Sequence, residues 1–598
     1  MQGNPNKLSQ FWQELKRRRV IHVITVYASA AFVLIELVNN LSEPLNLPSN
    51  LATIVIIVLA VGFPLAIVVS WLYDLTSEGI EKSKALSEVR EEEEKINVPN
   101  AWKIATIISF VVIIGLVTIN IVMGTRGLRP GDVQSLVILP FDNFTGDDQL
   151  DWVAAGMHSS LIGDMGRIGG LRVLGKTTSK AYEETDLTAA EIANEHNVDA
   201  LVEPTLTCYG EMVCIEIRVV TPYPEEKVLW VESYMEEKSQ LLNLSNRIIK
   251  QIAEEIRIEL SPEMVQRLAE SRTVDPEALD AYLKGIAYLD LFSGESWFVA
   301  IESFEKAIEI EPDWAAPYAG LAEVGTYMNQ AGFGPEADRI RMVYENLNKA
   351  FELDPNSTEA HQSNGITAAW VEFDWKKAEK EFLRAIELNP SQARSHSFYA
   401  HVLSILRRTD EALHHGKISQ ELDPENPFTL GLYVVVLMQS GICDKALFYL
   451  EKALSIDPDH PFLYGTLVDV YICLGDYEKV FVEGKKMHYE RWDRLGDAEL
   501  LEEIFYEQGY IAFNQELARI YEEAMANGIQ VSPEFVYGKY FTLGKYDKAM
   551  DYLEIIYEEN NRNPGLPYYS AKPIYDRMKG NQRYLALLKK MKLPVSED

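Results

Sequence analysis

Cysteine is scarce in this chain, with only four residues among 598, at Cys208, Cys214, Cys443 and Cys473. Their spacing matches no zinc or redox signature, so we expect no metal held by cysteine. The sequence also lacks a glycine-rich phosphate loop, an HExxH pair and a GxSxG motif, and its ten histidines have no partners at ligand or triad spacing. We therefore expect no catalytic residues, no metal and no cofactor, and the sequence favours a binding protein over an enzyme.

Positive charge is also in short supply. The chain carries 56 Lys and Arg against 90 Asp and Glu, which gives a formal net charge of -34. Binding to nucleic acid depends on neutralising phosphates with Lys and Arg, and no basic stripe occurs in the last four-fifths of the sequence. We expect no nucleic-acid partner, and a basic or neutral protein or peptide fits this charge better. The length implies several domains.

Long apolar runs are present only near the N-terminus, at about 20–38, 52–73 and 104–123. Each has about the 20 residues that a helix needs to cross a bilayer. No small-residue cleavage site follows the first run, which disfavours a signal peptide. The sequence predicts a membrane module over residues 1–128 with three transmembrane helices.

Basic residues near these runs indicate an orientation. Lys16, Arg17, Arg18 and Arg19 directly precede the first run, the loop to the second has no Lys or Arg, and the segment 74–103 is again basic at five positions. Cytoplasmic loops carry the excess of Lys and Arg. We expect an inner-membrane protein of a bacterium, with a cytoplasmic N-terminus and most of the chain in the periplasm.

Residues 132–262 predict a small α/β domain with a mixed sheet. Strand-like runs begin at Ser135, Leu171, Val198, Met212 and Lys227, and helical patterns cover 152–165, 187–196 and 241–260. A turn at 210–212 would place Cys208 opposite Cys214, where a disulfide could form. The loop DNFTGDD carries carboxylates but lacks the spacing and final Glu of an EF-hand, which disfavours a cation site.

From about residue 276 the chain repeats itself. The phrases EKAIEIEP, NKAFELDP, LRAIELNP, SQELDP and EKALSIDP end at Pro312, Pro355, Pro390, Pro424 and Pro458, and the last three intervals are 35, 34 and 34 residues. This is the period of tetratricopeptide repeats, each a pair of antiparallel helices. We expect seven or eight repeats over 276–598, the last ones divergent.

Stacked helix pairs form a solenoid with a concave groove that binds extended peptides or helices. Counting from the terminal prolines, the first helices of the repeats should present to this groove Trp370, Arg394, His401, Phe428, Met438 and Asp469. Cys443 and Cys473 should be adjacent in the stack, where they could form a disulfide or pack as small apolar residues.

Three regions carry a resemblance. FWQELKRRRVIHVITVYASAAFVLIELV with GFPLAIVVSWLYDLTSEGIEK resembles the membrane module at the head of many bacterial tetratricopeptide proteins. VILPFDNFTGDDQLDWVAAGMHSSLIGDM, with LRVLGKTTS and VDALVEPTL, is similar to the N-terminal domain of the translocation protein TolB, and LPYYSAKPIYDRMKGNQRYLALLKKMKLP resembles the usual ending of such repeat arrays. The TolB-like domain implies protein contacts rather than catalysis.

The expected fold class is mainly α: three transmembrane helices, a small α/β domain and an α-solenoid of tetratricopeptide repeats. The function we expect is a membrane-anchored scaffold that presents a periplasmic groove to proteins or peptides, basic ones among them. The alternative is a sensor that couples ligand capture outside to a cytoplasmic partner, although little of the chain is predicted to lie inside the cell.

Overall fold

The computed structural model describes residues 133–598 except 148–149, 184, 186, 223–225, 270–271, 290, 292, 459, 495–496, 560–562 and 596–598. Before residue 133 it describes only scattered positions. The chain divides into two compact units, Met1–Met123 and Gly124–Asp598, and each is described by itself.

The three predicted transmembrane segments, 20–38, 52–73 and 104–123, lie almost entirely outside the described residues. Within the part that is described, no helix combines the length and the apolar character needed to span a bilayer. The described positions of the first two segments are helical except Tyr73, and the Tyr27 hydroxyl donates a hydrogen bond of 2.8 Å to the Leu59 carbonyl, which joins these two segments. A short hairpin that the sequence analysis missed, β1 (Tyr73–Thr76) with β2 (Gly79–Lys82), begins at the last residue of the second predicted segment.

The second unit opens with a mixed sheet, as predicted. Its strands are β3 (Ser135–Ile138), β4 (Asp142–Asn143), β5 (Arg172–Val173), β6 (Ala200–Tyr209), β7 (Met212–Thr221) and β8 (Lys227–Glu237). Their order is β5-β3-β6-β7-β8, with β4 also paired to β6. The pairs β5-β3-β6 are parallel and β6-β7-β8 is an antiparallel meander, so β5 and β8 form the two edges.

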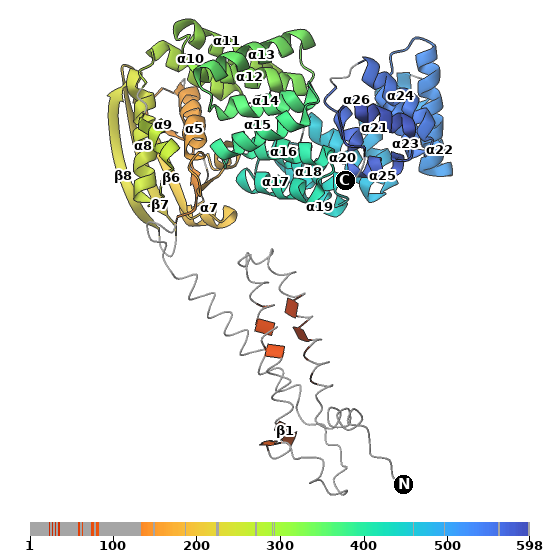
Figure 1. Cartoon of the computed structure of the whole chain (residues 1–598), viewed down its shortest axis with the longest axis horizontal. Coiled ribbons are helices and arrows are strands. Elements are labelled where there is room, and N and C mark those ends of the chain that lie inside the picture. Colours follow the sequence, from red (N-terminus) through yellow and green to blue (C-terminus); the bar gives the residue numbers. More distant parts are fainter. Residues whose placement is uncertain are drawn as a thin grey trace. The chain divides into compact units, whose positions relative to one another are not determined.

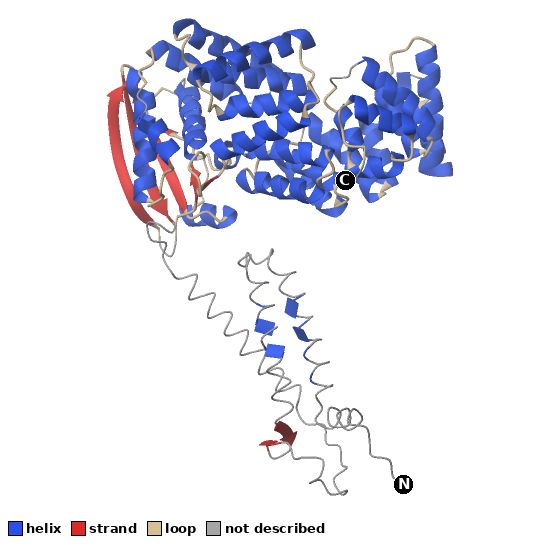
Figure 2. Ribbon diagram, in the orientation of Figure 1, coloured by secondary structure: helices blue, strands red, loops and turns tan. Residues whose placement is uncertain are grey.

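Helices cover one face of this sheet completely and the other only in part (Figure 2). The covering helices are α5 (Asp151–Met165), α8 (Leu241–Glu255) and α9 (Pro262–Ala269). Along β7 the buried residues alternate with half-buried ones, which is the period-2 pattern of a strand with one covered face. The small helix α7 (Ala189–His196) packs on the other face near β3, and η3 (Lys238–Gln240) precedes α8. The short helix α6 (Lys176–Lys180) contacts α5, where the Ser179 hydroxyl lies 3.0 Å from His158 Nε2.

The N-terminus of α7 shows how local sequence fixes an element boundary. Thr188 accepts from the Glu191 backbone N–H, and the Glu191 carboxylate accepts from the Thr188 backbone N–H, which makes a capping box. Asn197 then ends the helix in the left-handed conformation at φ 50°. The chain is thus turned back toward β6.

The rest of the unit is a series of antiparallel helix pairs (Figure 1). Their bounds are α10 (Pro276–Leu289) and α11 (Gly294–Ile310), α12 (Ala315–Gln330) and α13 (Glu336–Leu353), α14 (Thr358–Trp370) and α15 (Trp375–Leu388), α16 (Ala393–Ile405) and α17 (Thr409–Leu422), α18 (Pro427–Gln439) and α19 (Cys443–Ile456), α20 (Pro461–Leu474) and α21 (Tyr477–Arg494), the kinked α22 (Ala498–Ala526), α23 (Pro533–Thr542) and α24 (Tyr546–Glu559). The chain is mainly helical with a small sheet region, which confirms these parts of the predicted fold class.

Small residues let the helices of a repeat approach closely. Phe304 lies so near Gly285 and Gly320 that a Cβ added at either glycine would come within about 2.6 Å of its ring. Phe382 takes the same place against Gly365, and both phenylalanines are fully buried. The recurring small and aromatic residues of the sequence are therefore the packing contacts within repeats.

After α24 the chain turns back along the array. It forms η4 (Leu566–Ser570), α25 (Lys572–Met578) and α26 (Gln582–Lys590). Trp375 Nε1 donates to the Met591 carbonyl at 2.9 Å, and the Ser570 hydroxyl donates to the Ile405 carbonyl at 2.7 Å. The C-terminal segment is thus fixed to α14–α16, about 165 to 216 residues earlier in the sequence.

Candidate binding surfaces of the repeat array

Two of the six predicted groove residues are buried, which corrects the sequence analysis. Trp370 is 0% exposed and His401 is 1% exposed. The Trp370 ring lies 6.3 Å from that of Tyr568, and Tyr568 also contacts His401. The C-terminal segment that carries Tyr568 therefore occupies the groove at this point, and repeat spacing alone could not reveal this cover.

Both ring nitrogens of His401 are in use. Nε2 lies 2.9 Å from the Leu432 carbonyl and Nδ1 lies 2.5 Å from the Tyr568 hydroxyl. Because a carbonyl can only accept, Nε2 carries the proton and Nδ1 accepts from the tyrosine. Burial lowers the pKa of His401 to about 4, despite the favourable contact with Leu432. The ring is thus neutral in the folded protein at neutral pH.

Three further predicted groove residues are half-buried and already in contact with neighbours. Arg394 Nη1 lies 3.2 Å from the Tyr327 hydroxyl and 3.7 Å from a Glu323 carboxylate oxygen. Phe428 packs against two aromatic rings of the following repeat, and Met438 packs against the core. These side chains contribute to the stack of repeats.

Asp469 is the predicted groove residue that the structure leaves exposed. Protein atoms around the carboxyl group remove part of its hydration, and this desolvation raises the pKa of Asp469 to about 6. The positive charge of Lys539 partly opposes this increase. Lys539 is half-buried, and burial lowers its pKa to about 8. Among the described residues, Lys539 has no carboxylate within ion-pair distance. The repeat spacing did not identify Lys539, because this residue lies in a divergent repeat.

Exposed apolar side chains gather on α20, α21 and α22, which we call the α20–α22 surface. Tyr506 is 61% exposed and Ile511 57%, and the other members are Tyr464, Ile472, Tyr477, Val482, Met487, Tyr489 and Leu500. A hollow of about 380 Å³ lies between α21 and α22, lined by Phe481, Val482, Lys485, Lys486, Tyr489, Glu502 and Tyr506. Of the exposed side chains, Val482, Tyr489 and Tyr506 line this hollow, and exposed apolar side chains around a concavity are typical of an interaction surface.

Charge on this surface is mostly acidic on α22. The stretch from Ala498 to Gly509 carries Glu499, Glu502, Glu503 and Glu507 and no Lys or Arg. Lys485 Nζ lies 2.8 Å from Glu502, so one of the two lysines in the hollow is neutralised by α22 itself. The surface therefore combines apolar side chains with carboxylates.

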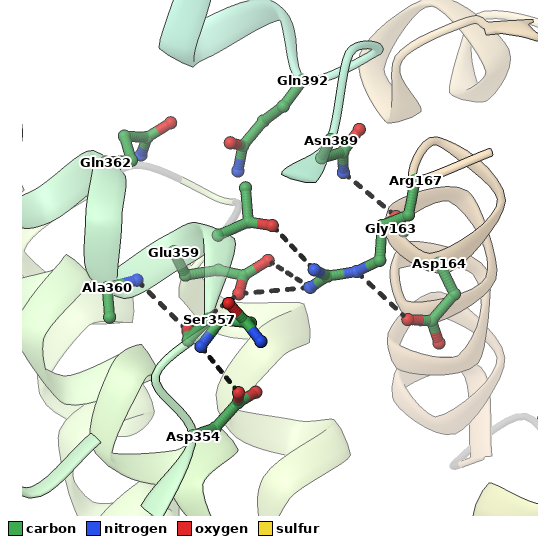
Figure 3. A network of polar contacts seen from close by, with 12 residues as sticks. Gly163, Asp164, Arg167, Asp354, Ser357, Glu359, Ala360, Gln362, Asn389 and Gln392 are labelled. Atoms are coloured by element: carbon green, nitrogen blue, oxygen red, sulfur yellow. Dashed lines mark hydrogen bonds and ion pairs between the residues drawn. The ribbon is translucent and has the colours of Figure 1, made fainter. Parts of the chain in front are cut away.

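The turns that end the repeats bind the α/β domain (Figure 3). Arg167, at the end of α5, donates to Thr358 Oγ1 at 2.7 Å and forms an ion pair of 3.3 Å with Glu359. Its side chain is 8% exposed. Burial acts to raise the pKa of Glu359, but Arg167 and the local hydrogen bonds outweigh it and hold that pKa below its usual value.

Equivalent residues of successive repeats share this task. Asn389, in the phrase ELNP, donates from Nδ2 to the Gly163 carbonyl at 3.0 Å. Asp423, in the phrase ELDP, accepts from the Thr178 backbone N–H at 2.9 Å and from its hydroxyl at 2.8 Å. The phrases that revealed the repeats in the sequence are thus also the contacts that fix the α/β domain to the array.

Among the described residues, one set of side chains could hold a metal ion, Glu195, His196 and Glu425, with ligand atoms within 4.8 Å of one another. Each member has another partner. The Tyr182 hydroxyl bonds to both Glu195 and His196, and Lys452 Nζ lies 2.6 Å from Glu425. The set accordingly lies where α7 approaches a repeat turn, and its members are hydrogen-bonded or ion-paired to residues outside the set.

The four cysteines form two disulfides. Cys208 and Cys214 are directly paired across β6 and β7, with Cα atoms 4.8 Å apart. Cys443 and Cys473 join α19 to α20, with Cα atoms 5.8 Å apart. The described chain contains no free cysteine.

Comparisons with known proteins add the following. No known protein-family profile matches the chain. A curated protein from Rhizobium meliloti (strain 1021), named putative adenylate cyclase 3, is 23% identical over 239 residues, which cover 40% of each chain. The chain therefore spans well under half of that relative's length.

Solved structures of repeat proteins are also similar. PilF of Pseudomonas aeruginosa is 16% identical, with 40% of this chain and 99% of that one covered and a TM-score of 0.27. YrrB, titled a TPR protein with an unusual peptide-binding site, is 22% identical, with 30% of this chain and 89% of that one covered and a TM-score of 0.21. These scores are low, and the assignment of tetratricopeptide-type repeats rests on the helix pairs and period of this chain.

Proposed function

We propose that this chain is a membrane-anchored, non-catalytic interaction protein that binds a protein partner on the α20–α22 surface. The observation that carries the proposal is the exposure of Val482, Tyr489 and Tyr506 around a hollow of about 380 Å³. The expected groove near His401 is occupied by the chain's own C-terminal segment. A partner therefore has more free apolar surface on α20–α22 than at the positions predicted from repeat spacing.

Charge indicates the class of partner. Almost the whole net charge of -34 falls after residue 123, because the first 123 residues hold nearly equal numbers of acidic and basic side chains. The α22 part of the surface has four carboxylates, of which Glu502 is ion-paired with Lys485, beside its exposed apolar residues. A segment that alternates basic and apolar side chains fits this surface.

Anchoring and location are further parts of the proposal. The apolar segments near the N-terminus and the basic residues beside the first of them support an inner-membrane anchor with residues 124–598 in the periplasm. The two disulfides support the same location, because such bonds persist in oxidising compartments. A fusion of alkaline phosphatase after Asp598 should be active, and an inactive fusion would contradict the periplasmic location.

The experiment that tests the binding surface is affinity purification of the full chain from detergent-solubilised membranes. The double variant Tyr489→Ala/Tyr506→Ala should recover a bound protein at least tenfold less well than the unmodified chain. Phe448→Ala is the matched control, because Phe448 is 62% exposed but lies on α19 outside the surface. Equal recovery with all three chains would overturn the proposal.

A second function, signal transduction across the membrane, is favoured by one specific observation. The α/β domain, which follows the third predicted span, is held to the repeat turns by Arg167, Asn389 and Asp423. A ligand that shifts the repeats would therefore shift the domain nearest the predicted membrane segment. If residues 124–598 retain their function on an unrelated membrane anchor, the transduction role is excluded.

A further inference from the structure

The two edges of the sheet differ in their cover. At the β5 edge, the Val173 backbone N–H donates to Ser391 Oγ at 3.1 Å, and the Gly175 N–H just beyond it donates to the Leu422 carbonyl at 2.7 Å. The β8 edge has 11 residues, pairs only with β7 among the described strands, and faces away from the helical array in Figure 1. One edge is thus covered by the repeats and the other is bare.

The direction of the backbone groups of β8 follows from the pairing register. The Lys238 N–H donates to the Glu211 carbonyl at 2.9 Å, and the register continues as Glu237 opposite Met212 and Glu236 opposite Val213. Because bonded and non-bonded pairs alternate in an antiparallel ladder, the even-numbered residues bond to β7. The N–H and C=O groups of Val231, Ser233, Met235 and Glu237 therefore point outward from the edge.

These outward positions lack the usual protection of an edge strand. Val231 is 52% exposed and Met235 is 68% exposed, and Ser233 lies between them. The three positions carry no charge and no proline, and no bulge interrupts the pairing from Val231 to Glu237. Apart from Glu237 at the end of the strand, the outward positions are thus uncharged, and such an edge is a template for pairing with another strand.

From this geometry we infer that β8 pairs with β8 of a second copy of the chain, antiparallel about a two-fold axis at Ser233. This register places Val231 of each copy opposite Met235 of the other, so that the two-fold axis generates two such pairs. Both pairs lie on the same open face of the sheet. It also places Glu232 opposite Tyr234 and Glu236 opposite Trp230. The strand therefore complements itself, and the two sheets become one.

Neighbouring registers are less favourable. An axis at Glu232 places this carboxylate opposite Glu232 of the second copy. An axis at Tyr234 places Glu232 of each copy opposite Glu236 of the other. Directly opposed like charges destabilise a strand pair. An axis at Met235 avoids these contacts but shortens the overlap, because β8 ends at Glu237. An axis at Val231 gives an overlap of the same length without opposed carboxylates, but that overlap includes the whole of the irregular stretch between Val228 and Trp230, where the pairing with β7 shifts its register. The axis at Ser233 therefore gives the longest regular overlap without opposed carboxylates.

Cysteine cross-linking of the full chain in its membrane tests the pairing. Ser233→Cys should form a disulfide-linked dimer on mild oxidation, because only residue 233 faces its own copy and the native cysteines are all paired. Glu237→Cys is the matched control on the same edge, and we expect its cross-linked fraction to be at least tenfold lower. Adding Met235→Lys to Ser233→Cys should reduce cross-linking by a similar factor, because it places an ammonium opposite Val231.

Each other outcome overturns the inference. No cross-link at either Ser233→Cys or Met235→Cys would show that the edge does not pair with itself. Equal cross-linking at both positions would indicate random collision. Efficient self-linking of Met235→Cys with none at Ser233→Cys would exclude the stated axis.

Discussion

The ion pair of Arg167 with Glu359 shows what one side chain contributes to the joint between the α/β domain and the repeats. Arg167→Ala would leave Thr358 and Glu359 without their donor inside that joint. We expect the free energy of unfolding to fall by about 2 kcal/mol, toward the lower end of values for broken buried pairs because Glu359 is 32% exposed. Urea unfolding of the full chain in detergent measures this.

The matched control for Arg167→Ala is Arg341→Ala, since Arg341 is 66% exposed and pairs on the surface with Asp338. Its loss should change the free energy of unfolding by less than about 0.5 kcal/mol. Similar changes for both variants would mean that the joint does not depend on Arg167.

His401 gives a prediction about pH. Its pKa is lowered to about 4 in the folded chain, against an ordinary unfolded value of about 6.5. The unfolded chain therefore binds the proton first as the pH falls, and the stability that the neutral ring provides is present above about pH 6.5 and is lost toward pH 4. At pH 5 the loss should be about 2 kcal/mol.

Unfolding at pH 7 and pH 5 checks this linkage. The difference in unfolding free energy between His401→Gln and the unmodified chain should shrink by about that amount at pH 5. For His414→Gln, at an exposed position of α17, the free energy of unfolding should change between pH 7 and pH 5 by the same amount as for the unmodified chain. If the unfolding free energy of His401→Gln changes with pH as much as that of the unmodified chain, the assignment of a neutral, buried ring is refuted.

At the scale of single elements, glycine is required in α22 but is unfavourable in α23. Gly509 has φ 86° and ψ 179° inside α22, a conformation that residues with a Cβ rarely adopt, and it makes the turn between the two halves of the helix. Gly509→Ala should cost about 2 kcal/mol. Gly538 lies within α23 with open space around it, so Gly538→Ala should stabilise the chain by about 0.7 kcal/mol. Thermal unfolding of the two variants should shift in opposite directions, and a shared direction would contradict this account.

The sequence predicts elements well where the pattern is local and repeated. The strands from Ser135 to Glu237 and the paired helices from Pro276 follow from period-2 and 34-residue patterns, and the opposition of Cys208 and Cys214 follows from one turn. The return of η4 onto α16 depends on contacts across more than 160 residues, such as Ser570 with Ile405. No local pattern encodes such a contact, which is why Trp370 and His401 were misplaced in an open groove.

At the scale of the whole unit, the α/β domain and the first repeat share one core. Met157 and Leu161 of α5, Leu279 and Leu283 of α10, and Trp314 before α12 belong to the same buried cluster. Gly156 lies against the Leu283 backbone so closely that a Cβ there would come within 2.6 Å of its carbonyl oxygen. The boundary near residue 276 is therefore a boundary in sequence pattern and not in packing.

This shared core predicts how truncated chains behave. A chain ending after Ser271 would lose Leu279, Leu283 and Trp314 and expose the face of α5 that they cover, whereas a chain ending after Gln330 would keep all three. Fully burying each large side chain contributes about 2 kcal/mol, so the shorter chain should lose several such contributions and unfold at a clearly lower temperature. Circular dichroism and binding of a hydrophobic dye measure this in detergent, with unmodified chain as the reference. Equal melting of the α/β domain in both truncated chains would show that the domain is stable without the first repeat, and the repeats could then be removed to map partners without disturbing it.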